Sequence, residues 1–466
     1  MRRRPPAAEA GLPPPRSEDA PAGTEAGTAR AGSTWAGARH AAELHDGLQG
    51  LREELLLWTE YTRPGGPLQR NHSQFARIAA TLSGAISATQ KRITVPPPAD
   101  LPAEVLDLHH IWDYFRSKLL LRHIPSHATF LTVADELAWS GYRAALTAAG
   151  GAEVPKEPPL VSLHRDASPR AHRKGSQYRD LLPRGGLHTV PGSHLVRHLP
   201  FPVVQLPWSH RNHLPGLLFV AHEVGHHIQD DLLRAGTLPY RLRHSTPDAS
   251  RAALWNDWAD EAFADICACL IAGPAYAAVL ADSLAVPSGG SGSGADRYPP
   301  PLLRLRLCLA ALRVAGHGPR ESVPAAAAEF LAGREDEDGE ARAVAEALLC
   351  DPYEELGGRR LAEVLLLTRP GEGESAAGRL LAGREPGTAG APAPALAGAA
   401  VAFGRDPGGY AGRRVHQRVL DEVAAAVPEG IRNRPGPKGA PDDAALGRML
   451  LDAARATREP EGAAAD

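Results

Sequence analysis

The sequence is poor in cysteine, with four residues in a chain of 466. So few thiols exclude a small fold held together by disulfide bonds. A zinc ribbon is excluded as well, because no two of the cysteines form a Cys-x-x-Cys pair. We expect a cytoplasmic protein, the default for a chain with no segment that resembles a signal peptide or a membrane span, and reduced thiols are expected there.

A surplus of positive charge is also missing. The 51 lysines and arginines are balanced by 54 aspartates and glutamates, which gives a formal net charge of −3. Proteins that bind nucleic acids normally carry a basic surplus that contacts the phosphates. The charge balance therefore argues against a nucleic-acid partner.

The chain lacks an apolar stretch long enough to cross a membrane. Two longer uncharged runs exist, at Ile266–Ala281 and Pro386–Gly404. The first is too short to cross about 30 Å of hydrocarbon, and the second contains three prolines and is typical of a linker. The basic N-terminus has no apolar segment behind it, as a signal peptide would have. We expect no membrane partner.

Glycine and proline are abundant instead, with 47 and 43 residues. Segments rich in them favour flexible or disordered chain. On this basis we predict six regions, namely a disordered N-terminal tail at 1–34, a helical hairpin at 35–95, a central core at 96–283, a flexible Gly/Ser/Pro insertion at 284–301, a helical C-terminal region at 302–457 and a tail at 458–466.

Two apolar stripes predict the hairpin. The residues that form them recur at alternating spacings of three and four, namely Leu44, Leu48, Leu51, Leu55 and Trp58 in the first stripe and Phe75, Ile78, Leu82, Ala85 and Thr89 in the second. This spacing places each set on one face of a helix, and the turn at Arg63–Pro67 makes the two helices antiparallel. We expect the hairpin to pack on the core or on a second copy of the chain, so self-association is one predicted interaction.

A short β-like run at Phe201–Pro207 precedes two strongly predicted helices, at 214–233 and 252–272. Proline cannot donate a hydrogen bond within a sheet, so its presence favours an edge position for this strand. The expected fold class is α+β, mainly helical, with one small sheet.

The helix at 214–233 contains the motif His222-Glu223-x-x-His226. Residues four apart lie on one face of a helix, so both imidazoles can point at a single metal ion. Two neutral imidazoles at this spacing suit a tetrahedral Zn²⁺. Glu223 follows His222 directly and can reach a metal-bound water without binding the metal itself.

A catalytic zinc needs a third protein ligand, and the helix at 252–272 offers several carboxylates. Glu261 and Asp265 are four residues apart and share one helical face. One of them can bind the metal, while the other accepts the proton on the second nitrogen of a ligand histidine. The spacing alone does not decide which of the two binds the metal, and Asp257 is a further candidate.

His222-Glu223-x-x-His226 followed by Glu261-x-x-x-Asp265 resembles the gluzincin branch of the zincin metallopeptidases. The resemblance implies that His222, His226 and Glu261 bind Zn²⁺. It also implies that Glu223 is the general base and that Asp265 orients the first histidine.

The resemblance covers residues 200–275 and implies a zincin-like core, in which the strand at 201–207 pairs with an extended peptide or protein substrate. The expected activity is hydrolysis of peptide bonds by a metal-activated water. A donor to the negative charge that develops on the substrate oxygen is also expected, and the candidates are Tyr276, Tyr298, Arg304 and His317. Two alternatives stay open, namely a non-catalytic, zinc-stabilised helical interaction module and a zinc hydrolase that acts on a non-peptide amide.

Overall fold

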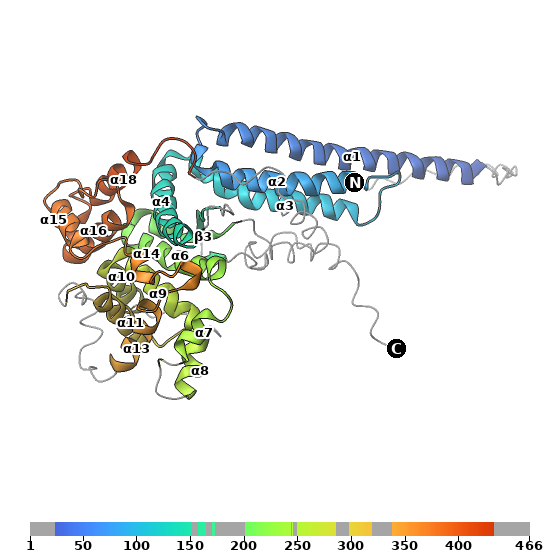
Figure 1. The fold of residues 1–466 in the computed structure, drawn as a ribbon. Helices are drawn as coiled ribbons and strands as arrows, with labels where there is room; N and C mark the ends of the chain where they lie inside the picture. The colour runs from blue at the N-terminus through green and yellow to red at the C-terminus, as the bar shows by residue number, and fades with distance from the viewer. Residues whose placement is uncertain are drawn as a thin grey trace, which may run out of the picture.

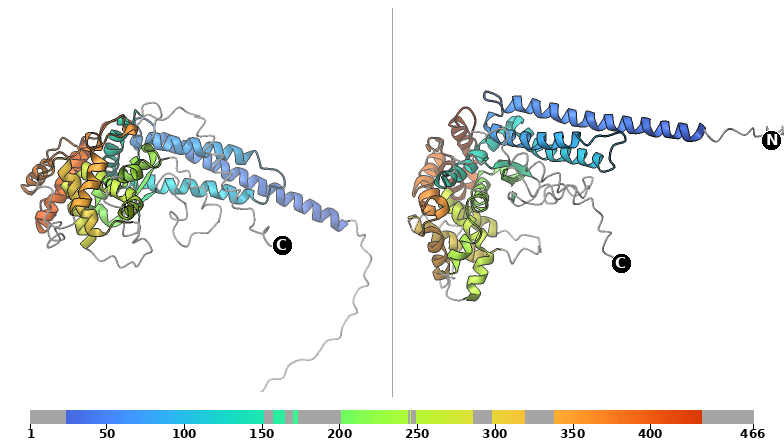
Figure 2. Two further views of the ribbon diagram at one scale, coloured as in Figure 1. Left: turned by 60° about the horizontal axis from the view of Figure 1, so that its bottom comes forward. Right: turned by 45° about the vertical axis from the view of Figure 1, so that its right-hand side comes forward.

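The computed structural model describes residues 24–150, 157–164, 170–172, 201–243, 245, 249–285, 298–318 and 338–432. As predicted, the described chain is mainly helical with one small sheet. Its helices form two groups with separate hydrophobic cores. In Figures 1 and 2 three long helices extend to one side of a larger group. The C-terminal tail at 458–466 and most of the predicted Gly/Ser/Pro insertion lie outside the described residues.

The three long helices form a bundle. They are α1 (Thr24–Thr62), α2 (His72–Gln90) and α3 (Leu101–Leu120), joined in part by the short 3₁₀ helix η1 (Gln69–Asn71). The two predicted apolar stripes are buried in the bundle core, where α3 also contributes. Because α1 begins at Thr24, the predicted disordered tail at 1–34 is wrong for its last part, which is helical. No helix in the described part of the chain is both long and apolar enough to cross a membrane.

The larger group, called the body here, contains the remaining helices. They are η2 (Leu121–His123), α4 (Pro125–Ala148), η5 (Trp208–Asn212), η6 (Leu214–Leu218), α6 (Phe219–Leu232), α7 (Thr237–Leu242), α8 (Ala249–Asp257), α9 (Ala259–Ala272), α10 (Pro274–Ala285), α11 (Pro301–Val314), α13 (Asp338–Leu349), η9 (Glu354–Leu356), α14 (Leu361–Leu365), α15 (Glu372–Leu381), α16 (Pro392–Arg405), α17 (Pro407–Tyr410) and α18 (Val415–Ala425). Helix α6 packs extensively against α9 and α4, which places it inside the body.

A three-stranded sheet lies between the bundle and the body. Its order is β1 (Leu160–His164), β3 (Val203–Pro207) and β2 (Arg170–His172), with β3 parallel to β1 and antiparallel to β2. Leu160 and Val203 pack into the bundle core. The residues that follow them point the other way, since side chains alternate along a strand, and they pack into the body.

The predicted edge position of the strand at 201–207 is wrong, because β3 is the central strand. Both of its faces are covered, which explains its nearly continuous apolar sequence. Its two prolines do not conflict with this position. Pro202 precedes the strand and Pro207 ends it, so neither removes a donor from the interior of the ladder.

The predicted linker at Pro386–Gly404 is also wrong, because most of it forms helix α16. Pro392 and Pro394 lie in the first turn of this helix, where backbone N–H groups have no intrahelical acceptor. The alanines that follow are strong helix formers, and they are largely buried in the body core. Uncharged composition therefore marked a buried helix rather than a flexible connection.

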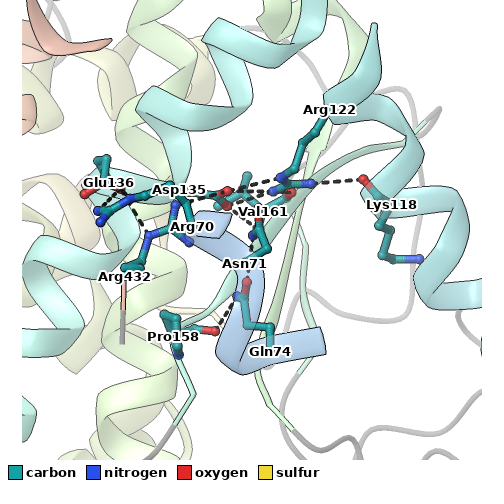
Figure 3. Close-up of polar contacts among 10 residues, drawn as sticks. All are labelled: Arg70, Asn71, Gln74, Lys118, Arg122, Asp135, Glu136, Pro158, Val161 and Arg432. Carbon is teal, nitrogen blue, oxygen red and sulfur yellow. Dashed lines mark hydrogen bonds and ion pairs between the residues drawn. The ribbon is translucent and has the colours of Figure 1, made fainter. Parts of the chain in front are cut away.

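A buried polar network joins the bundle, the sheet and the body at helix α4 (Figure 3). Arg122 donates from Nη2 to both carboxylate oxygens of Asp135, at 2.9 and 2.8 Å, and to the carbonyl of Val161 in β1, at 2.7 Å. Asp135 Oδ1 in turn accepts from the backbone N–H of Val161 at 3.0 Å. One carboxylate in the middle of α4 thus binds both the 3₁₀ helix that precedes α4 and the first strand.

The neighbouring carboxylate, Glu136, extends this network to η1 in the bundle and to the last described residue (Figure 3). Its Oε1 accepts from Arg70 Nη2 at 2.6 Å and from Arg432 Nε at 3.1 Å. Arg432 also pairs with Asp135 at 3.5 Å, and both side chains are 1% exposed. Buried guanidinium and carboxylate groups need such partners, because an isolated buried charge is very costly.

Helices α6 and α9 approach closely where Gly225 faces α9. A Cβ atom added to this glycine lies 2.7 Å from the Cα of Ala264 and 3.0 Å from the Cβ of Cys267. Glycine destabilises a helix interior by about 0.8–1 kcal/mol relative to alanine. Here its missing side chain permits the two backbones to come together. This approach sets the distance between the two helices that carry the predicted metal ligands.

We predict that Gly225→Ala lowers the urea midpoint of unfolding. The added methyl group clashes with backbone atoms of α9, and overpacking of this kind costs about 1–3 kcal/mol. This loss exceeds the stabilisation of about 0.8–1 kcal/mol that alanine gives to a helix interior. Gly84→Ala is the matched control, because Gly84 lies in mid-helix with no atom within 4 Å of the added Cβ. We expect the control to raise the midpoint, and equal shifts in both variants would contradict the close approach.

Candidate metal centre

His222 and His226 face each other on one side of α6. The apolar residues Val220, Val224 and Ile228 fix this orientation, because they bury the opposite side of the helix in the body core. The Nε2 atoms of the two histidines are 3.2 Å apart, and their rings are perpendicular. Both side chains are buried, so the two nitrogens converge on one enclosed point.

Glu261 completes this cluster from α9. Its Oε2 lies 3.3 Å from His222 Nε2, and its Oε1 lies 3.5 Å from His226 Nε2. The three potential ligand atoms all lie within 4.8 Å of one another. Within the described part of the chain, Glu261 Oε2 is buried and accepts no hydrogen bond. A metal ion that binds at the centre of the cluster supplies the partner that this oxygen lacks.

The chemistry of these donors fits zinc. Two imidazole nitrogens and one carboxylate oxygen form a three-ligand set found in catalytic zinc sites, which keep the fourth position for water or substrate. Among the residues that the structure describes, no fourth side chain that could bind a metal joins the group, whether histidine, cysteine, aspartate or glutamate. Asp257, the alternative third ligand, is exposed at the end of α8 and is not part of it.

Asp265 lies on the opposite side of His222, one turn beyond Glu261 in α9. Its Oδ1 is 2.9 Å from His222 Nδ1, and the carboxylate is fully buried. It does not reach the cluster of metal-binding atoms. Of the two carboxylates on this face of α9, one therefore lies beside the Nε2 atoms and the other beside Nδ1 of the same histidine.

Tyr276 and Arg304, two predicted donors to the substrate oxygen, lie behind His222 and contact Asp265 instead. Tyr276 donates its hydroxyl to Asp265 Oδ1 at 2.6 Å. Arg304 donates from Nε to Oδ2 and from Nη2 to Oδ1, each at 2.8 Å. Tyr298 is half exposed, with its ring 5.4 Å from the Arg304 guanidinium.

The charges around His222 strongly perturb the pKa values of the centre. Burial disfavours a charge on His222, but the neighbouring carboxylates of Asp265 and Glu261 outweigh it and raise the His222 pKa to about 10. Burial also disfavours the charge on Asp265, yet Arg304 and His222 hold the pKa of this carboxyl well below its ordinary value. In the metal-free centre, His222 therefore carries a second ring proton at neutral pH, between the carboxylates of Asp265 and Glu261.

The contact between Arg304 and Asp265 is the part of the centre that we did not predict. A signal for it exists in the sequence, because Arg304 lies within the apolar run Leu302–Ala311. An arginine on a buried helix requires an anionic partner. The run does not indicate which of the 54 acidic residues is that partner, and only the packing of α11 on α9 identifies it.

We predict that the purified protein binds one equivalent of zinc, measured by elemental analysis after dialysis. His222→Ala and Glu261→Ala remove ligands and should reduce the bound zinc to well below one equivalent. Asp257→Ala is the control for loss of a carboxylate outside the cluster, and it should retain the full equivalent. Full retention in the Glu261 variant would assign the third ligand elsewhere.

We also predict that zinc binding at pH 7 releases about one proton, because a histidine ligand must be deprotonated and the metal-free His222 has a raised pKa. The affinity for zinc should therefore increase as the pH rises from 6 to 9. Isothermal titration calorimetry in buffers of different ionisation enthalpy measures the proton count. A binding heat that is independent of the buffer would show that the site is already deprotonated.

We found no match to the chain among protein-family models, curated protein sequences or solved structures. What is established is a buried group of two histidines and one glutamate that could hold a metal ion.

Proposed function

We propose that this protein is a zinc-dependent metallopeptidase of the gluzincin type. The observation that carries the proposal is the convergence of His222, His226 and Glu261 on one point from two adjacent helices. The order of these residues along the chain, together with Asp265 behind the first histidine, agrees with the motif on which the resemblance rests. A bound Zn²⁺ supplies a Lewis acid that acidifies water and polarises a carbonyl group.

Glu223 is the proposed general base. It follows His222 on α6, is 7% exposed, and its charge acts on the His222 imidazole. A base in that position accepts a proton from the attacking water and passes it to the leaving amine. It is not among the three residues whose atoms converge, which suits a residue that handles protons and does not bind the metal.

Asp265 is proposed to orient His222. A carboxylate that accepts from Nδ1 fixes the tautomer in which Nε2 keeps its lone pair for a metal. The 2.9 Å separation between Asp265 Oδ1 and His222 Nδ1 supports this role.

The sheet suggests where a peptide substrate binds. Because β3 is central, it cannot accept another strand, and the substrate-pairing role that we predicted for it passes to an edge strand. Among the described strands, β2 lies at one edge of the sheet and contacts α6, whereas β1, at the other edge, contacts α4 and α3. We propose that an extended peptide adds to β2, since main-chain pairing orients peptides without regard to sequence.

The alternative of a non-catalytic zinc-stabilised module is less well supported. A zinc ion that only holds a fold together is normally enclosed by four protein ligands, and three converge here within the described residues. A zinc hydrolase of a non-peptide amide needs the same residues as a peptidase. A comparison of peptide and simple amide substrates therefore distinguishes these two activities.

We predict that Glu223→Gln lowers the rate of peptide hydrolysis by about 10²–10⁴-fold, because the proton acceptor is lost, while zinc content and thermal stability stay unchanged. The assay follows cleavage of a fluorescently labelled unfolded protein by zinc-loaded enzyme. Asp257→Asn is the matched control, since it removes an exposed carboxylate outside the cluster. Equal hydrolysis by the wild type and the Glu223 variant, or no hydrolysis by either, would sink the peptidase assignment.

A further inference from the structure

Asp265 is held by donors from three other helices. His222 lies on α6, Tyr276 on α10 and Arg304 on α11, and all three contact the carboxylate of Asp265 on α9. Both carboxylate oxygens are occupied, with Oδ1 shared by all three donors and Oδ2 bound by Arg304 Nε. The group is fully buried, so water does not compete for these positions.

The two-point contact with Arg304 determines how the carboxylate is oriented. A guanidinium that donates two parallel hydrogen bonds fixes the plane of the carboxylate as well as its position. The Tyr276 hydroxyl adds a third donor on Oδ1. Arg304 and Tyr276 together leave Asp265 one orientation, in which Oδ1 faces His222 Nδ1.

This orientation has a consequence at the other nitrogen of His222. A carboxylate paired with arginine acts only as an acceptor, so Nδ1 of the neutral imidazole must carry the proton. Nε2 then has a lone pair, and Nε2 is the atom that lies 3.3 Å from Glu261 and 3.2 Å from His226 Nε2. Arg304 and Tyr276 thus influence the metal-binding atoms through Asp265 and His222.

We propose that Arg304 and Tyr276 are positioning residues of the metal centre, which set its affinity for zinc by fixing the Asp265–His222 pair. The proposal rests on the zinc site of the proposed function, but it does not require that the protein hydrolyse peptides. It makes α10 and α11, which contribute no metal ligand among the described residues, part of the centre.

A purely structural role for the ion pair is the competing explanation. Buried ion pairs are poor stabilisers, because well-packed apolar residues of similar volume often serve as well or better. Leu303, Leu305 and Leu307 beside Arg304 are all buried, so the site lies in surroundings where an apolar residue would pack. Stability alone therefore does not explain the buried arginine and aspartate at this position, whereas an effect of their charges on His222 does.

The test compares Tyr276→Phe and Arg304→Lys with Tyr353→Phe. Tyr353 is the matched control, because it is also fully buried in the body core and donates its hydroxyl to a backbone carbonyl, that of Leu348, at 2.9 Å. Each Tyr→Phe change therefore removes one buried hydrogen bond, but only one of the two bonds belongs to the Asp265 network. Arg304→Lys keeps the positive charge and removes the two-point contact.

Zinc affinity is measured by competition with a chromophoric chelator, and the visible spectrum of the Co²⁺-substituted protein reports the ligand geometry. We expect a loss of zinc affinity of about 10–100-fold in Tyr276→Phe and Arg304→Lys, as for other residues that support metal ligands, together with an altered Co²⁺ spectrum. Tyr353→Phe should keep both the affinity and the spectrum of the wild type.

Zinc affinities that are equal in all four proteins, or reduced equally in the three variants, would overturn the proposal. If Arg304→Lys does not fold, the comparison between the two tyrosine variants decides the result. The outcome is independent of the peptidase assignment. If the variants show the expected losses of zinc affinity but the wild type cleaves no peptide, only the proposed activity is contradicted. If the wild type cleaves peptides but the variants keep its zinc affinity, only the positioning role is contradicted.

Discussion

The close packing of α6 against α9 is the constraint on which the candidate site depends. Two histidines on one helix can share a metal ion through local geometry alone, but the third ligand has to come from elsewhere in the chain. The glutamate side chain is short, so its helix must lie directly beside the first. Gly225 permits this, because its missing side chain leaves room for the backbone of α9 at Ala264. The metal centre is thus a property of a helix pair.

The same helix pair explains why much of the site could be predicted from the sequence. His222, His226 and the spacing of Glu261 and Asp265 follow helical periodicity, which is a local rule. The structure brings the first three together and places Asp265 behind His222. Arg304 could not be assigned its partner in this way, because their contact depends on how α11 packs against α9. Local patterns predict which residues share a face, and they do not predict which faces meet.

The errors in the predicted fold have the same origin. The mainly helical class and the apolar stripes of α1 and α2 follow from periodicity, and the structure confirms them. The prolines of the strand at 201–207 predict an edge position, but the position of a strand is decided by what covers it. Here the bundle covers one face of β3 and the body covers the other. The composition of α16 predicts a linker, but the surrounding helices bury its alanines.

The polar network at α4 has a consequence for how the protein forms during synthesis. Arg432 follows Glu136 by 296 residues, so the ribosome produces nearly all of the described chain before this arginine emerges. Domains generally fold from the N-terminus as they are made, and the bundle and sheet can therefore assemble while Glu136 has Arg70 as its cationic partner but still awaits Arg432. The last guanidinium then closes the network. Completion of this network is in this sense a late event, in which the last residue of the described chain returns to a helix made much earlier.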